Sequence, residues 1–583
     1  MKNKTLRRVI DLARPHRKTI IIVSLLSLIV SLTEIAKPYL IEIVIDQYLT
    51  AGIWQKGLFS IGIISAVYIG LVLIGYIIDL IATVTTNMMG EEVIYSLRNK
   101  LFRFTQYANI SFHDKTSAGK LFVRITNDIE DIATLFKDVI STFLKDIIMI
   151  LAITVMMVII SFQLSWYVFL MVPFIFLFSY IFTKWLNRVY VKAKNIRTQL
   201  NTFLAESIYG AKVIKIFNIQ NEKQKECEKY TYGYWKQRRI EGFIQSMLPG
   251  LMTILENLAI CLIIWACLNK WFGVELEVGF IYVFTTYIKK LFEPITRIVE
   301  NIETVQDAAV SVNKVYDILD EKENLEDFGT GKELKKLTGK IEFKHVWFTY
   351  RPEVPDSWIL KDISFVVEPG ESVAFVGKTG SGKTTITNLL NRFYDIQKGE
   401  ILIDGINIKE INLRSLRKHI GIILQDPFIF AKSIKDNIRL NENLNDESVK
   451  KALKLASADE FVDNLPEGIE EIAKERGNSY SAGQKQLLAF ARIFAHSPDI
   501  FILDEATANI DTETESLIQE NIEKISRNKT SIFIAHRLST IVNVDKIIVI
   551  YQGEIIEQGT HQELLQTGGY YANLYQSYYE SLG

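Results

Sequence analysis

Hydrophobic and polar positions divide the chain into two halves of different character. Residues 147–183 contain no charged side chain, and this run is too long for one helix of a soluble core. It predicts two membrane-spanning helices joined by a tight turn at 161–165. Residues 61–78 predict a third span, and the apolar run from residue 19 past Glu34 predicts a fourth.

Two weaker apolar stretches, around 246–269 and 278–299, bring the expected number of spans to six. They are interrupted by five charged residues, Glu256, Lys289, Lys290, Glu293 and Arg297. The connections at 90–130 and 184–240 are longer than ordinary loops and have helical patterns on both sides of their centres. We therefore expect the spans to leave the bilayer as long helices and to return.

Charged residues in or beside the spans have two possible positions. Intramembrane charges usually face a cavity or a paired protein interior, and a substrate path would then be lined by Glu34, Asp79, Glu256 and Lys289. Alternatively, the charges lie at span ends or in helical extensions outside the lipid, as Lys37, Asp46, Glu293 and Arg297 also could.

The second half alternates between short apolar runs and helical patterns. Composition changes near residue 320, and the polar segment 321–340 is typical of a linker. Residues 341–350 alternate as a strand does, and further strand-like runs recur up to residue 551. We expect a membrane all-α six-span domain over 1–320, the linker, and an α/β domain with a largely parallel sheet over 341–583.

Charge and composition exclude some classes of partner. The net charge is −1, so no basic field favours nucleic acid. The segment before the first span and both long connections are basic, which places the two termini in the cytoplasm. The three cysteines and seven histidines show no spacing typical of a metal site, so no structural metal is expected.

The segment "GKTGSGKTT" predicts a phosphate-binding loop. It follows a strand-like run and precedes a helical one, which is the context that such a loop requires. Lys383 would reach the β- and γ-phosphates of a nucleotide, and the Thr384 hydroxyl would bind Mg²⁺. The loop comprises Gly377, Lys378, Thr379, Gly380, Ser381, Gly382, Lys383, Thr384 and Thr385.

Four polar residues at predicted strand ends fit the same chemistry. Asp504 and Glu505 end an apolar run, so Asp504 would serve Mg²⁺ and Glu505 would orient an attacking water. Gln425 would complete the Mg²⁺ shell or sense the γ-phosphate, and His536 would bridge that phosphate and Glu505. Tyr350 follows the first strand and could stack on a nucleotide base.

A second turn of potential anion donors lies a hundred residues after the loop, at "YSAGQ". Ser481, Ala482, Gly483 and Gln484 precede a helical run and could present N–H groups and a hydroxyl to a phosphate. Because the loop already serves the chain's own nucleotide, this turn must serve a different nucleotide or none.

The order of Tyr350, the phosphate loop, Gln425, "YSAGQ", Asp504-Glu505, Asp511 and His536 resembles the nucleotide-binding domain of ABC transporters. The first 320 residues are similar to the six-span domain of ABC exporters, and 110–132 and 205–223 look like its two coupling-helix regions. The resemblance implies ATP and Mg²⁺ as cofactors, Asp511 in the nucleotide site, and location in a bacterial cell membrane. It also implies head-to-tail dimers in which "YSAGQ" completes the partner's ATP site.

Departures from the family pattern bear on the partner. The usual Leu-Ser-Gly-Gly-Gln is altered at Tyr480 and Ala482, whereas Glu505 is kept. In this family, heterodimeric exporters often pair a chain that keeps this glutamate and has an altered signature with a chain of the opposite kind. The resemblance therefore favours a heterodimer of half-transporters over a homodimer. Export of a drug, lipid or peptide is expected. An importer of the exporter fold and an ATP-gated channel remain alternatives, although a channel would be expected to lose a catalytic residue.

Overall fold

The computed structural model describes residues 3–50, 58–268, 278–321, 325–440, 442–504, 512–527, 529–534 and 541–580. These residues form two compact units. The helical unit comprises 1–106 and 116–323, and the α/β unit comprises 107–115 and 324–583. Each unit is described by itself.

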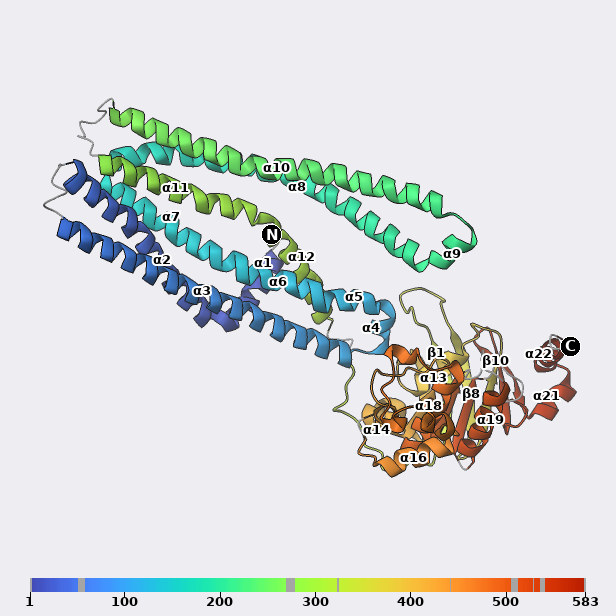
Figure 1. Ribbon diagram of the computed structural model, residues 1–583. Helices are drawn as coiled ribbons and strands as arrows, with labels where there is room; N and C mark the ends of the chain where they lie inside the picture. The colour runs from blue at the N-terminus through green and yellow to red at the C-terminus, as the bar shows by residue number, and fades with distance from the viewer. Residues whose placement is uncertain are drawn as a thin grey trace. The chain divides into compact units, whose positions relative to one another are not determined.

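The helical unit is built from long helices and short helical segments between them (Figure 1). The helices are α1 (Asn3–Ala13), α2 (Arg17–Val44), α3 (Leu58–Tyr107), α5 (Ala118–Val123), α6 (Ile129–Thr134), α7 (Ser141–Ile160), α8 (Phe162–Tyr209), α9 (Ala211–Ile216), α10 (Gln220–Leu268), α11 (Val278–Glu300) and α12 (Ile302–Leu319). A 3₁₀ turn (Arg14–His16) and π-helical segments (Ile45–Thr50, Arg124–Asp128, Leu135–Ile140) connect some of them.

Five helical stretches of the described chain are long and apolar enough to cross a membrane. They are 4–50, 58–107, 118–160, 162–209 and 220–265, so they include the four strong predicted spans and one of the two weaker ones. Helix α11 is not among them and carries five charged residues, so the sixth span stays a prediction. Helix α3 has 50 residues and is about 75 Å long, more than twice the ~30 Å hydrocarbon core.

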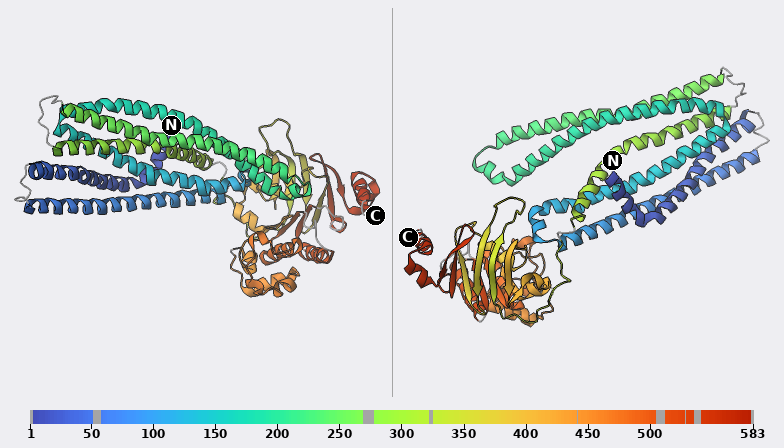
Figure 2. Two further views of the ribbon diagram at one scale, coloured as in Figure 1. Left: turned by 45° about the horizontal axis from the view of Figure 1, so that its top comes forward. Right: turned by 180° about the vertical axis from the view of Figure 1, so that it is seen from behind.

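The helices α8 and α10 run side by side and are joined through α9 (Figures 1 and 2). We call residues 205–223, which contain α9, the second tip. Its apolar side chains are largely exposed: Tyr209 is 90% exposed, Ile216 73% and Phe217 70%. At the other end of α8, Ser161 alone separates this helix from α7, and its hydroxyl accepts a hydrogen bond from the Leu164 N–H.

The α/β unit contains two sheets (Figure 2). The larger has the order β10 (Glu554–Gly559), β9 (Lys546–Tyr551), β3 (Ser372–Val376), β8 (Thr530–Ile534), β7 (Ile500–Asp504) and β6 (Ile420–Ile423). All its neighbouring strands are parallel except β10 and β9, which confirms the largely parallel sheet. The smaller sheet is antiparallel, with the order β2 (Leu360–Val367), β1 (Ile341–Phe348), β4 (Lys398–Ile403) and β5 (Ile406–Asn407).

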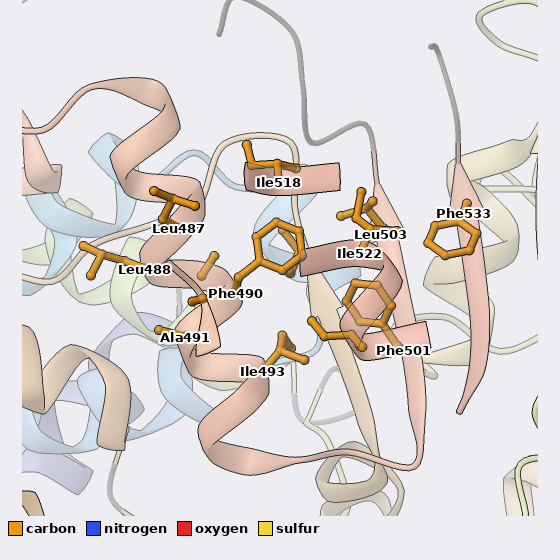
Figure 3. Packing of buried hydrophobic residues seen from close by; sticks show 14 of the residues in the cluster. Leu487, Leu488, Phe490, Ala491, Ile493, Phe501, Leu503, Ile518, Ile522 and Phe533 are labelled. Carbon is orange, nitrogen blue, oxygen red and sulfur yellow. The ribbon is translucent and has the colours of Figure 1, made fainter. Parts of the chain in front are cut away.

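Helices pack against these sheets through two clusters of buried apolar residues. In Figure 3, Phe490 projects from α18 towards Ile518 and Ile522 of α19, with Phe501 of β7 beneath them. The helices are α4 (Ile110–Lys115), α13 (Lys383–Leu390), α14 (Leu413–His419), α15 (Ile434–Arg439), α16 (Asp446–Leu455), α17 (Asp459–Asp463), α18 (Ala482–His496), α19 (Thr512–Ser526), α21 (His561–Thr567) and α22 (Tyr570–Glu580), with 3₁₀ turns at Ile408–Glu410, Gly468–Glu470 and Glu475–Gly477.

The α/β unit also includes a segment from the first half of the chain, residues 107–115, which we call the first tip. The Tyr107 carbonyl accepts a hydrogen bond of 2.8 Å from the Glu326 N–H. The Tyr107 ring lies edge-on against Phe328, and the Tyr394 hydroxyl donates to the Asp114 carboxylate. The first tip is thus held by contacts with residues more than 200 positions later in the sequence.

Candidate functional site

The parallel sheet brings the predicted site residues to one edge. Strand β3 ends at Val376, directly before the predicted phosphate loop, and β7 ends at Asp504. Strand β6 ends two residues before Gln425, which is exposed. Because carboxyl ends of parallel strands share an edge, these three segments face the same side of the unit. Glu505, Asp511 and His536 lie outside the described residues.

The loop after β3 wraps around its own lysine. Lys383 is 5% exposed, and its ammonium donates to the carbonyls of Gly377 at 2.8 Å and Lys378 at 3.1 Å. Gly382 has a φ of +108°, which side chains rarely adopt. A Cβ on Gly377 would lie 2.2 Å from the Ile550 carbonyl oxygen. Glycine is therefore required at both positions for the loop to close.

The loop has the features of an anion site. Helix α13 begins at Lys383, so its first N–H groups point out of the helix beside the loop. The Ser381 hydroxyl is buried and has no hydrogen-bond partner within the described residues. Lys378, Thr379, Gly380 and Thr384 are exposed. N–H donors and one cation are thus placed where a polyphosphate would fit.

The neighbouring residues fit a nucleotide with a divalent cation. The Thr384 hydroxyl, the Asp504 carboxylate and the Gln425 amide oxygen are the hard oxygen ligands that Mg²⁺ prefers. Tyr350 donates to the Thr385 hydroxyl at 3.1 Å, and its ring packs edge-on against Phe348 and Tyr394. Tyr350 is 38% exposed, which leaves part of the ring open to contact a base.

The second anion turn is preorganised by a capping box. Ser481 caps α18: its hydroxyl accepts from the Gln484 N–H, and its own N–H donates to the Gln484 side chain. Ser481 and Ala482 are exposed, whereas Gly483 is buried. Tyr480 is only 9% exposed and packs towards Phe461. Of the two departures noted in the sequence, Tyr480 therefore concerns packing, and Ala482 lies on the open surface of the turn.

Sequence reasoning missed a polar network behind this turn. Arg492 of α18 donates to the Phe428 carbonyl at 2.8 Å and to the backbone and side-chain oxygens of Asn437 at 2.7 and 3.0 Å. Asn437 in turn exchanges hydrogen bonds with the backbone of Phe430. Burial lowers the pKa of the Arg492 guanidinium to about 10, so this side chain stays charged at neutral pH. A single arginine within the apolar run 487–495 was the available signal.

The network borders a cavity of about 760 Å³, which we call the groove. Its wall includes four exposed apolar side chains, those of Leu424, Phe428, Phe430 and Leu440. Leu424 of the groove wall directly precedes Gln425, so the groove adjoins the segment that reaches the nucleotide edge. An exposed apolar patch in a groove is typical of a site that binds another protein segment, a membrane or a ligand.

Some of the charges predicted in or beside the spans are paired. Glu34 contacts Lys37 at 2.5 Å and also Lys290, and Asp79 contacts Lys145 at 2.5 Å. Two of the residues predicted to line a substrate path are thus held in ion pairs. The other two, Glu256 and Lys289, have no ion pair within the described part of the chain, and Lys289 is exposed.

Comparison with known proteins agrees with both units. Residues 20–295 match the ABC transporter transmembrane region, and residues 360–508 match the ABC transporter family. A putative ABC transporter ATP-binding protein, exp8, of Streptococcus pneumoniae is 35% identical over 99% of this chain and 98% of its own length. A probable multidrug resistance ABC transporter ATP-binding/permease protein, YheH, of Bacillus subtilis is 39% identical over 84% of this chain and 73% of its own.

A solved structure is similar over nearly the whole chain. It is that of a bacterial Atm1-family ABC exporter with ATP bound, with a TM-score of 0.81 and 26% sequence identity. The likeness covers 97% of this chain and 98% of the other. The fusion of membrane helices with a nucleotide-binding unit in one chain is therefore shared with an exporter.

Proposed function

The chain belongs to the ABC transporter family, as an ATP-hydrolysing transporter of the exporter type, and on this premise we propose that it is one half of a two-chain pump. The pump would move a hydrophobic or amphipathic substrate out of the cytoplasm across the cell membrane, with both termini of the chain inside. The observation that carries the proposal is the phosphate loop at the edge of β3, fused to helices that are long enough to cross a bilayer.

Hydrolysis at this site would use groups from both chains. Lys383 and the N–H groups of the loop would hold the phosphates, and Mg²⁺ held by Thr384, Gln425 and Asp504 would supply positive charge beside them. Glu505 orients the attacking water, His536 contacts the γ-phosphate, and Asp511 belongs to the same site. The exposed turn at Ser481 and Ala482 closes over the ATP of the other chain. ATP thereby joins the two α/β units, and hydrolysis separates them.

The first and second tips would transmit the closing of the α/β units to the long helices. The first tip is part of the chain's own α/β unit through Tyr107 and Asp114. The second tip carries exposed Tyr209, Ile216 and Phe217, which match the exposed apolar wall of the groove in chemistry. We infer that the groove of each chain receives the second tip of the other. Opening and closing of the α/β units would then move the long helices and expose the substrate path alternately inside and outside.

The departure at Ala482 supports two different chains over two copies. A methyl group on the open face of the turn crowds a phosphate that approaches the backbone, so the site that this turn completes would be the weaker one. The site on this chain's own loop would keep Glu505 and be the stronger one. Two sites of unequal strength would require a partner chain that lacks the catalytic glutamate and keeps the usual Leu-Ser-Gly-Gly-Gln.

Purified protein in liposomes tests the proposal. We expect MgATP hydrolysis and accumulation of the lipophilic dye Hoechst 33342 inside liposomes in which the α/β units face outward. Both activities should be lost in the Lys383→Ala variant, because Lys383 is the cation inside the loop. Lys335→Ala, at an exposed lysine outside the loop, is the matched control and should keep most of the activity. Equal ATP turnover in wild type and Lys383→Ala would refute the assignment of the loop.

A further inference from the structure

The groove carries free positive charge as well as apolar wall. Arg414 and Lys418 lie four residues apart on α14, and both are exposed. Neither forms an ion pair within the described residues. The other two cations of the wall are engaged, because Arg417 binds the Glu326 carboxylate at 2.7 Å and Arg492 binds backbone carbonyls.

Few negative charges balance Arg414 and Lys418. Glu442 is the one acidic residue of the groove wall in the part of the chain that the structure describes. The groove therefore presents an apolar floor with a net positive rim. A tip that inserts apolar side chains there brings its own charges close to that rim, where water is partly excluded and screening is weak.

The second tip of this chain has the same sign of charge. Lys212 and Lys215 are exposed on α9, three residues apart and hence on one face of the helix. Neither forms an ion pair among the described residues. The tip as a whole, residues 205–223, contains three lysines and two glutamates. The glutamates, Glu206 and Glu222, lie near its two ends outside α9, so the tip keeps a net positive charge.

We propose that the groove is built for the second tip of a different half-transporter, one that carries acidic residues where this chain has Lys212 and Lys215. In a homodimer each groove would meet two lysines, and their repulsion by Arg414 and Lys418 would weaken that pairing. A partner with acidic residues at these positions would meet no such repulsion and would be preferred. The inference rests on the proposed docking of tip into groove. It is independent of the Ala482 argument, because it uses charges on a different surface.

Charge reversal with disulfide crosslinking tests this inference in the full-length chain. The three native cysteines are replaced by serine, and Ile216→Cys and Phe430→Cys provide one thiol on the tip and one in the groove. The chain is purified alone in lipid nanodiscs and oxidised, and the yield of crosslinked dimer is measured. Reversal of the tip (Lys212→Glu with Lys215→Glu) should raise that yield about three- to tenfold, since repulsion becomes attraction at partly exposed sites.

Two further variants complete the cycle. Reversal of the groove alone (Arg414→Glu with Lys418→Glu) should raise the yield similarly, and combined reversal of tip and groove should return it to the wild-type level. Lys225→Glu with Lys229→Glu, on α10 outside the second tip, is the control and should change little. Because salt screens repulsion, added 0.5 M NaCl should raise the wild-type yield and lower that of the single reversals.

The outcomes separate the inference from the proposed function. Efficient crosslinking that does not respond to any reversal would overturn the acidic-partner inference and leave docking standing. No crosslinking in any variant, with or without salt, would refute docking itself, and the inference would fall with it. A response in one reversal that persists in the combined variant would show a local effect of the new residues and also refute the inference.

Discussion

Replacement of Gly483 by alanine should destabilise the α/β unit through a contact that has no part in nucleotide binding. Gly483 is buried in the first turn of α18, and a Cβ at this position would lie 2.5 Å from Cγ2 of Thr514 on α19. Threonine is β-branched and stiff at χ1, so it cannot move aside cheaply. Overpacking of this kind costs about 1–3 kcal/mol, and the better helix propensity of alanine offsets up to ~1 kcal/mol.

The net loss of about 1–2 kcal/mol should lower the melting temperature by roughly 2–8 °C in a unit of this size. Thermal unfolding of the purified full-length chain, followed by intrinsic fluorescence, measures it. Thr514→Ser removes the closest atom and leaves contacts of 3.2 and 3.3 Å, so the double variant should recover most of the loss. Thr514→Ser alone is the matched control and should change the melting temperature by less than the glycine variant does.

ATP hydrolysis then separates packing from phosphate binding. If the Gly483 backbone also approaches a phosphate, the double variant should melt normally and still hydrolyse ATP slowly. Recovery of both properties would mean that packing alone requires glycine. A double variant as unstable as Gly483→Ala alone would refute the steric argument.

Five further substitutions test other parts of the molecule. Gly210→Pro should uncouple ATP hydrolysis from dye transport, because the Gly210 N–H donates to the Glu206 carbonyl at 2.8 Å at the second tip; an unchanged ratio of transport to hydrolysis would count against that tip as a coupling element. Glu505→Gln should retain ATP binding and reduce ATP turnover about 10²–10⁴-fold. Ala482→Gly should alter turnover little in a heterodimer and strongly in a homodimer. ATPase assays of the chain alone and with a second half-transporter distinguish the two assemblies. Arg492→Met should destabilise the α/β unit by about 1–3 kcal/mol, since it removes the charged donor of the Phe428 and Asn437 carbonyls, and Arg492→Lys should restore part of this loss. Equal thermal stability of wild type and Arg492→Met would contradict the network.

Local patterns predicted much of this architecture. Apolar runs bounded by polar turns identified the strands that carry the phosphate loop, Gln425 and Asp504, and uninterrupted apolar length identified the strong spans. Of the antiparallel sheet only the strand β1 was predicted, because β4 and β5 are short and the pairing of β1 with β2 and β4, and of β4 with β5, is not visible in one segment. The short helices α4 and α9 were hidden inside the predicted tips for a similar reason.

Long-range contacts escaped sequence reasoning altogether. The hydrogen bonds from Arg492 to Phe428 and Asn437 join positions that are 64 and 55 residues apart, respectively. Hydrophobic periodicity does not predict such contacts. The buried state of Tyr480 likewise depends on Phe461 across a turn. The ion pair of Asp79 with Lys145 was not predicted either, because hydropathy marks a charge as unusual but does not name its partner.

The membership of the first tip in the α/β unit has a consequence for biosynthesis. Asp114 is made 280 residues before Tyr394, to which it is hydrogen-bonded in the finished chain. At the usual 5–20 residues per second, the ribosome needs roughly 15–55 s to reach that tyrosine. During this interval several later helices are made while the first tip lacks its binding surface. Maturation of this protein must therefore end with a post-insertion docking step, and a messenger truncated before residue 324 would yield a membrane protein with a permanently bare tip for proteases to recognise.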